Sequence, residues 1–388
     1  MKFSCLLLAA FILHTGTTHD CVTINGTTDF DNQNLTCIPQ DLPIDIESLD
    51  LSENNLGVIL NKSFARYGNL KKLEIDNSYI HTVQPEGFNG LNSLENVSLA
   101  GNTLNISTDG LFILTNIRNI INLDFSSNMN SSDKRGYLFY PDEVFQLLIK
   151  LRNLSIDLYG HPVFGPGFKY LKLNSIRFKS CCITALQNKT FVNLPDSVTE
   201  LHLTECKFIE NKDIEINLLF PFSKMSIFSF SDAIILTAGT TQYLKAICVK
   251  TLALADNDIV DILPYSFFYL DWKHLSCLEH LDLSGNRFGF STIGIQMLTV
   301  GQKLSNLKIF DFSYIPLKYK SANYLPVINY FKPNQLRVKR EDESCSDAVI
   351  GPLDISIPPR LEFVRITHSW CTTSNEIESE EYCWLTIS

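Results

Sequence analysis

Four basic side chains could together recognise an anion. They stand in or just before three successive apolar segments that we expect to be strands, and they are Arg152, Arg177, Lys179 and His202. Alternate residues of a strand point to opposite faces, and we expect these four to share the solvent-facing side. A small basic cluster on a sheet binds phosphate or sulfate through charge-assisted hydrogen bonds. The alternative is that they are ordinary solvated residues, with acidic neighbours that reduce their charge.

Cysteines form a second group whose spacing suggests chemistry. The chain has 11, and loss of Cys5 with the N-terminal segment would leave an even number, as is typical of oxidising compartments. We expect Cys21 and Cys37 to pair, because a disulfide-closed loop would cover the first apolar layer of the fold. Cys248 and Cys277 each precede the first leucine of an apolar segment by four residues, which favours a disulfide between them.

Cys181 and Cys206 also occupy equivalent positions in neighbouring segments. Two interpretations remain open for them. They are either buried thiols that act as weak hydrogen-bond donors or a disulfide, since neighbouring strands lie about 4.8 Å apart. We expect no metal site at Cys248 and Cys277.

Sequons of the form Asn-x-Ser/Thr predict N-linked glycans on an exported chain. All of them lie before residue 190, so we expect sugar on the N-terminal half and a bare C-terminal half. The predicted acceptors are Asn25, Asn34, Asn61, Asn96, Asn105, Asn130, Asn153 and Asn188.

A basic run near the C-terminal end could be a proteolytic site. Arg337, Lys339 and Arg340 form an R-x-K-R sequence, which matches the preference of proprotein convertases of the secretory pathway. Cleavage of this kind occurs at exposed loop tips. The alternative is a solvated, charge-rich loop, because acidic residues follow at once.

Catalysis has no candidate constellation in this sequence. We find no H-E-x-x-H, G-x-S-x-G, P-loop or G-x-G-x-x-G motif, and the 8 histidines are scattered without a pattern. We therefore expect no enzyme and no cofactor. The net charge of -10 argues against nucleic-acid binding by the whole surface.

The elements that must position these residues form a repeat. A Leu-x-Leu-x-x-Asn pattern starts at residues 49, 73 and 97, a spacing of 24 residues, and it returns at 252 and 281. This pattern and period predict leucine-rich repeats. We expect an α/β solenoid of horseshoe type, with a parallel sheet on the concave face and irregular or short helical segments on the convex side. The expected first core residues are Leu49, Leu73, Val97, Leu123, Leu154, Ile176, Leu201, Phe228, Leu252, Leu281 and Phe310.

Two further positions of the repeat have structural roles. The asparagine of the motif should bond the backbone of adjacent turns, where water cannot reach. A phenylalanine recurs between strands, at Phe64, Phe88, Phe191 and Phe267, and we expect it to pack in the convex side.

The domain boundaries follow from the same reading. Residues 1–19 have the basic start and short apolar run of a signal peptide, which predicts a secreted protein. We expect a disulfide cap at 20–48, about eleven repeats at 49–320, an irregular insert loop at 321–360 and a last, uncapped repeat at 361–388. No later apolar run is long enough for a transmembrane helix.

The chain resembles Toll-like receptor ectodomains over residues 21–388. The resemblance rests on the Cys37-Ile38-Pro39 cap loop, on the uneven repeat lengths, and on Leu194-Pro195-Asp196-Ser197 and Ile357-Pro358-Pro359 between repeats. It implies an extracellular pattern-recognition ectodomain of innate immunity. Such a protein binds a microbial or endogenous ligand and acts by pairing with other leucine-rich-repeat ectodomains.

The chain departs from that family at its C-terminal end. It lacks the cysteine-rich cap, membrane helix and TIR domain of family members. Cys371 and Cys383 are a candidate pair that does not follow the family's cap pattern. A truncated or soluble form is therefore expected. Two alternatives are a soluble decoy of a full-length receptor, and an adhesive or matrix protein with leucine-rich repeats. The two-cysteine N-terminal cap favours the Toll-like interpretation.

Overall fold

The structure is a computed structural model, and it divides into two compact units. Unit 1 comprises Met1–Ser180 with Asn193–Pro195, and unit 2 comprises Cys181–Val192 with Asp196–Ser388. The residues described are 27–105, 112–128, 137–183, 190–208, 222, 224–231, 248–257, 276–282, 284–286, 306–311, 338–340, 363–365 and 385–387.

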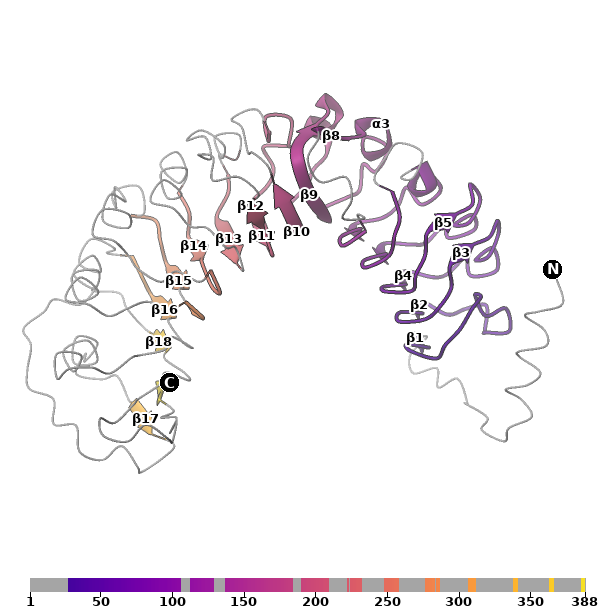
Figure 1. The fold of residues 1–388 in the computed structure, drawn as a ribbon, viewed down its shortest axis with the longest axis horizontal. Helices are drawn as coiled ribbons and strands as arrows, with labels where there is room; N and C mark the ends of the chain where they lie inside the picture. Colours follow the sequence, from indigo (N-terminus) through magenta and orange to yellow (C-terminus); the bar gives the residue numbers. More distant parts are fainter. Residues whose placement is uncertain are drawn as a thin grey trace, which may run out of the picture. The chain divides into compact units, whose positions relative to one another are not determined.

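Unit 1 is built on a parallel sheet of short strands, which Figure 1 shows side by side in indigo to magenta. Their order in the sheet follows the order of the repeats. The strands are β1 (Thr27–Asp29), β2 (Ser48–Asp50), β4 (Lys72–Glu74), β6 (Asn96–Ser98), β7 (Asn122–Asp124) and β9 (Asn153–Phe164), with β10 (Ser175–Ile183) next to β9. A second small sheet pairs β3 (Val58–Ile59) with β5 (Thr82–Val83).

The register of the sheet aligns the expected core residues. Leu49 pairs with Leu73, Leu73 with Val97, Val97 with Leu123 and Leu123 with Leu154. These central residues are all buried, whereas the residues on either side of them are exposed or half-buried. Because a strand alternates its faces, one apolar residue in each three-residue strand is enough to line the core.

The asparagine of each motif closes the turn that follows the strand. Asn102 is 3% exposed, and its carbonyl oxygen accepts the backbone N–H groups of Ser78 at 3.0 Å and Ile80 at 2.9 Å. Its amide nitrogen donates to the carbonyl oxygens of Ile75 at 2.8 Å and Leu99 at 3.0 Å. This pattern agrees with the expected role, because buried backbone groups require partners.

The residue before that position adopts a left-handed conformation in repeat after repeat. The positive φ values are 55° at Glu53, 51° at Asn77, 68° at Gly101, 57° at Ser127, 50° at Ser180, 53° at Glu205, 53° at Asp256 and 65° at Gly285. Only glycine adopts this conformation without a steric cost. At Gly101 a Cβ would also meet the side chain of Asn77, so this glycine is required on two counts.

Buried phenylalanine pairs lie in the segments between the strands of the sheet. Phe64 and Phe88 are both 0% exposed, and their ring centroids are 6.0 Å apart. Phe191 is also 0% exposed and lies 5.8 Å from Phe222 in unit 2. Phe267 lies outside the described residues.

The regular pattern of unit 1 changes at β9. This strand has 12 residues, and its second half pairs in parallel with β8 (Tyr137–Tyr140). The buried carboxylate of Asp157 accepts the N–H groups of Ser127 at 2.5 Å and Asn128 at 2.9 Å. In earlier repeats the amide oxygens of Asn54, Asn102 and Asn128 accept backbone N–H groups in this way. Short helices among the described residues of this unit are η1 (Phe112–Asn116), α3 (Asp142–Phe145) and η3 (Pro166–Tyr170).

Unit 2 contains a parallel sheet of the same type. Leu201 pairs with Phe228, Phe228 with Leu252, Leu252 with Leu281 and Leu281 with Phe310, so each of these residues occupies its predicted position. Phe310 pairs in turn with Val364. The strands are β11 (Glu200–Thr204), β13 (Ile227–Ser231), β14 (Thr251–Ala253), β15 (His280–Asp282), β16 (Ile309–Asp311) and β18 (Phe363–Arg365). The two-residue β12 (Lys207–Phe208) pairs with the end of β10.

An antiparallel pair joins two segments near the C-terminal end. β17 (Val338–Arg340) pairs with β19 (Leu385–Ile387). Lys339 and Arg340 of the predicted proteolytic run therefore lie in a strand, whereas we expected an irregular loop. Pairing of the backbone with β19 satisfies the peptide groups that a loop would leave to water.

The fold prediction is confirmed: both units are parallel-strand leucine-rich-repeat solenoids with little helix. Among the described residues, no helix has the length and apolarity needed to cross a membrane.

Candidate binding surface

The solvent-facing side of the unit 1 sheet carries two rows of polar side chains. One row contains Ser48, Lys72, Asn96, Asn122 and Asn153, which are neighbours in the register of β2, β4, β6, β7 and β9. The other row contains Asp50, Glu74, Ser98, Asp124 and Ser155, in the same register. Each strand contributes one residue to each row, because the residue between them points into the core.

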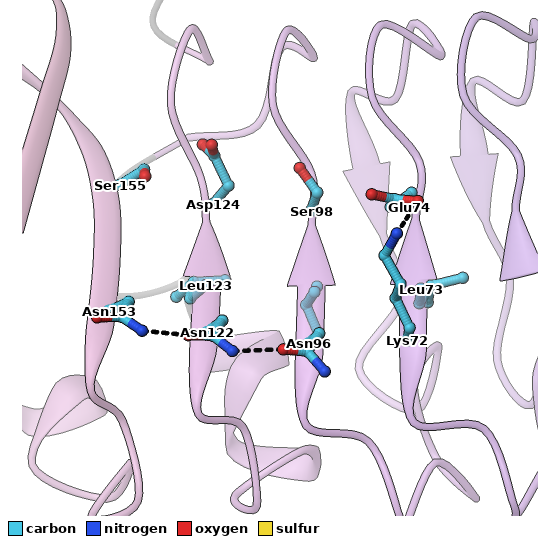
Figure 2. Close-up of a pocket in the computed structure, with 11 residues that line it drawn as sticks. Lys72, Leu73, Glu74, Asn96, Ser98, Asn122, Leu123, Asp124, Asn153 and Ser155 are labelled. Carbon is cyan, nitrogen blue, oxygen red and sulfur yellow. Dashed lines mark hydrogen bonds and ion pairs between the residues drawn. The ribbon is translucent and has the colours of Figure 1, made fainter. Parts of the chain in front are cut away.

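A hollow of 210 Å³ opens on this surface, between β4 and β9. Its lining residues are Lys72, Leu73, Glu74, Asn96, Val97, Ser98, Asn122, Leu123, Asp124, Asn153 and Ser155, and Figure 2 shows them. Amide and hydroxyl groups on β6, β7 and β9 line most of it, and its charged groups are Lys72 and Glu74 on β4 and Asp124 on β7. We call this feature the strand-face hollow.

Three amides form a ladder across the hollow. The Asn122 amide nitrogen donates to the carbonyl oxygen of Asn96, and the Asn153 amide nitrogen donates to the carbonyl oxygen of Asn122 (Figure 2). Asn153 is exposed, whereas the other two residues are half-buried. The ladder fixes the orientation of each amide, so its hydrogen-bonding groups face outward at defined positions.

Both lysines at this surface are paired with a carboxylate. Lys72 lies 2.7 Å from Glu74 on the same strand, as Figure 2 shows. Lys179, on β10, lies 2.7 Å from Asp124 on β7. The two ion pairs balance the charges, and hydrogen bonding rather than net charge is therefore the main chemistry of the hollow.

Asp124 has a lowered pKa. Burial by itself raises the pKa, but hydrogen bonds from the Lys179 ammonium and from the hydroxyl and N–H groups of Ser126 outweigh that effect. Asp76 is close to the same surface and shows the opposite result. Burial is the largest influence there and raises its pKa, although the Ser98 hydroxyl donates to the carboxylate at 2.6 Å.

The Lys179→Met substitution is expected to lower stability at neutral pH by about 1 to 2 kcal/mol, because it removes a charge-assisted hydrogen bond. Asp124 has a folded-state pKa below the unfolded value of about 3.9, so it contributes stability above that pH and loses it as the pH falls through the folded pKa. The difference between variant and wild type should therefore shrink in acid. Thermal midpoints between neutral and acidic pH measure this difference, with the exposed Lys172→Met as control. A difference independent of pH would contradict the prediction.

The four predicted anion-binding residues have different surroundings in the structure. Arg152 directly precedes β9 and is half-buried. Its guanidinium donates to the carbonyl oxygens of Ile149 at 3.3 Å and Leu151 at 3.0 Å. Lys179 is paired with Asp124. Arg177 is exposed on β10. His202 belongs to unit 2, where it lies 3.8 Å from Glu200.

Two disulfides lie among the described residues of unit 2. Cys248 and Cys277 are bonded, with Cα atoms 5.4 Å apart, and Cys181 and Cys206 are bonded, with Cα atoms 4.2 Å apart. The second pair replaces two successive asparagines of the buried turn by a covalent link. Cys37 is exposed. Its predicted partner Cys21 lies outside the described residues, as do Cys371 and Cys383.

The sequons fall in two kinds of place. Asn34, Asn61 and Asn105 are exposed in loops, whereas Asn96 and Asn153 begin strands and line the hollow. Asn25, Asn130 and Asn188 lie outside the described residues, and so does Arg337 of the predicted proteolytic run. In the described part of the chain, no group of three or more histidine, cysteine or acidic side chains is placed to hold a metal ion.

The hollow itself is absent from the expectations drawn from sequence. The sequence does carry a signal for it, since the residues on either side of the central core residue are polar in five successive repeats, from Leu49 to Leu154. Basic residues were the stronger sequence signal for a binding site, and the asparagine and serine residues were not predicted to form one.

Comparison with known proteins supports the repeat assignment. The family model "Leucine rich repeat" matches residues 44–104, and a second model, "Leucine Rich Repeat", matches residues 277–298. Toll-like receptor 3 of Boselaphus tragocamelus is 34% identical over 89 residues, which is 23% of this chain and 9% of the receptor. Toll-like receptor 3 of Bos taurus is 35% identical over 80 residues, which is 21% of this chain and 9% of the receptor. The matches thus span less than a tenth of these relatives.

Among solved structures, an internalin from Listeria monocytogenes aligns with a TM-score of 0.43 and 16% identity, over 76% of this chain and 82% of that one. The repeat fold and the two family-model matches together identify the chain as a leucine-rich-repeat protein.

Proposed function

We propose that this chain is an extracellular binding protein of the Toll-like pattern-recognition type. The observation that supports this most directly is the extended polar surface of the unit 1 sheet, on which two rows of side chains lie in register from β2 to β9. Leucine-rich-repeat solenoids act as scaffolds for interaction rather than as catalysts, and their extended sheets form binding surfaces. The short matches to Toll-like receptor 3 favour a receptor of that type.

We propose one contact with the ligand. Arg177 is exposed on β10, and a guanidinium is suited to bind a phosphate, sulfate or carboxylate group of a microbial or endogenous ligand. Lys179 is less suited, because Asp124 already neutralises it.

The Arg177→Glu substitution tests this contact. We expect the secreted wild-type chain to bind a heparin-derived octasaccharide in a saturable manner, and the variant to bind it at least tenfold more weakly, since one charged hydrogen-bonded contact contributes about 1.5 to 3 kcal/mol. The Lys169→Glu variant has the same charge change at an exposed residue of η3 and serves as control. Equal affinities of the wild type and both variants for the octasaccharide would show that Arg177 does not contact the ligand.

The receptor type has its own test. Secreted full-length chain should bind members of a panel of microbial cell-wall glycans, lipopeptides and nucleic acids, and light scattering should detect pairing when a ligand is added. Retention of the chain inside the cell, or binding to no member of the panel, would argue against the proposal.

A further inference from the structure

We infer that N-linked glycans on Asn96 and Asn153 cover the strand-face hollow and control access to it. The inference rests on the proposed extracellular function, because these glycans are added only in the secretory pathway. Asn96-Val97-Ser98 and Asn153-Leu154-Ser155 are both sequons, and both asparagines line the hollow. Most glycans are expected on loops, but these two acceptors stand in the middle of the sheet surface.

The geometry permits attachment at both residues. In the amide ladder, Asn96 takes part through its carbonyl oxygen, and Asn153 takes part through one N–H of its amide. An asparagine amide has two N–H groups, so Asn153 retains one donor after a sugar replaces the other hydrogen. The ladder is therefore compatible with both glycans.

The modification is a group transfer from a lipid-linked oligosaccharide diphosphate. A bond forms between the asparagine Nδ2 and the anomeric carbon of the first sugar. The bond between that carbon and the phosphate oxygen breaks, the lipid diphosphate leaves, and Nδ2 loses one proton. No oxidant or reductant is required.

The positions of Asn96 and Asn153 place their glycans over the strand-face hollow. Asn96 and Asn153 lie on β6 and β9, with only β7 between them, so they are about 10 Å apart at the spacing of neighbouring strands. Asn122, on β7, is followed by Leu123 and Asp124 and is not a sequon. Two oligosaccharides thus flank the centre of a hollow of only 210 Å³, and each extends beyond it. With the hollow covered, a ligand of unit 1 contacts residues outside β6–β9, such as Arg177 on β10.

Occupancy is measured first. The full chain is secreted from cultured animal cells and digested, and each sequon is assayed by mass spectrometry for conversion of asparagine to aspartate on enzymatic release of the glycan. We expect Asn96 and Asn153 to be occupied, together with the loop sequons Asn34 and Asn61. Glycans at the loop sequons with bare Asn96 and Asn153 would overturn the inference but leave the extracellular function intact. A secreted chain with no glycan at any sequon overturns the inference alone, and a chain that never enters the secretory pathway overturns both.

Shielding is measured second, through the acylation rate of Lys72. This lysine lines the hollow and is the register neighbour of Asn96. The Ser98→Ala, Ser155→Ala double variant loses both sequons but keeps both asparagines, and its Lys72 should be acylated several-fold faster than in the wild type. The exposed Lys169 provides the internal reference, and the Ser98→Thr, Ser155→Thr variant keeps both sequons and should behave as wild type. An unchanged Lys72 rate in the alanine variant would overturn the shielding.

Discussion

The Asn102→Leu substitution is expected to destabilise unit 1 by about 2 to 6 kcal/mol. Leucine has a similar size but removes the acceptor of two buried N–H groups, those of Ser78 and Ile80. A buried N–H without a partner costs about 1 to 3 kcal/mol, and two are left here. The carbonyl oxygens of Ile75 and Leu99 lose a donor as well. The urea midpoint, with peptide-level hydrogen exchange over residues 75–104, measures the loss.

Two further variants make this result interpretable. Asn119→Leu is the matched control, since Asn119 is exposed and makes a single bond to the carbonyl oxygen of Asn92. Asn102→Ser should be intermediate, because Ser78 occupies the equivalent position in the preceding repeat and its hydroxyl donates to Leu51 at 2.9 Å. If Asn102→Leu and Asn119→Leu have equal midpoints, the asparagine does not stabilise the turn.

The Phe88→Ala substitution has a comparable expected effect for a different reason. Phe88 is 0% exposed and lies against Phe64, so its removal leaves a cavity that a packed core fills only in part. Substitutions of this kind cost about 3 to 5 kcal/mol. Chemical unfolding monitored by tyrosine fluorescence and circular dichroism gives the value.

Phe112→Ala provides the comparison for Phe88. Phe112 is 58% exposed in η1, and a surface substitution of this kind changes stability by about 0.5 kcal/mol or less. Phe88→Leu should fall between the two alanine variants, because leucine fills part of the cavity. A loss below about 1 kcal/mol for Phe88→Ala would show that packing of Phe88 against Phe64 is not a main source of the stability of unit 1.

The core residues could be predicted from the sequence because equivalent positions of successive repeats pair with one another in the sheet. Once Leu49, Leu73 and Val97 share a phase, parallel pairing places them side by side, and no long-range information is needed. The turn asparagines follow for the same reason. The 12-residue β9 and its pairing with β8 could not be predicted, since they depend on packing between residues that do not repeat.

The candidate site was harder to predict because it depends on side-chain geometry. The ion pair between Lys179 and Asp124 joins residues 55 positions apart and reaches across the strand between them. Sequence showed the charge of Lys179 but not its partner, and it therefore overstated the basic character of this surface. The sequons at Asn96 and Asn153 were visible in sequence, whereas their place in a hollow required the structure.

The turn asparagines also set the order in which repeats can complete their hydrogen bonds during synthesis. The carbonyl oxygen of Asn54 accepts from Gln33 and Leu35, that of Asn102 from Ser78 and Ile80, and that of Asn128 from Leu104. In each case the later repeat completes the backbone bonds of the earlier one. A chain emerging from the ribosome therefore cannot finish a repeat until the next has been synthesised. Its growing end always carries one open turn, and chaperones would meet that turn until synthesis moves past it.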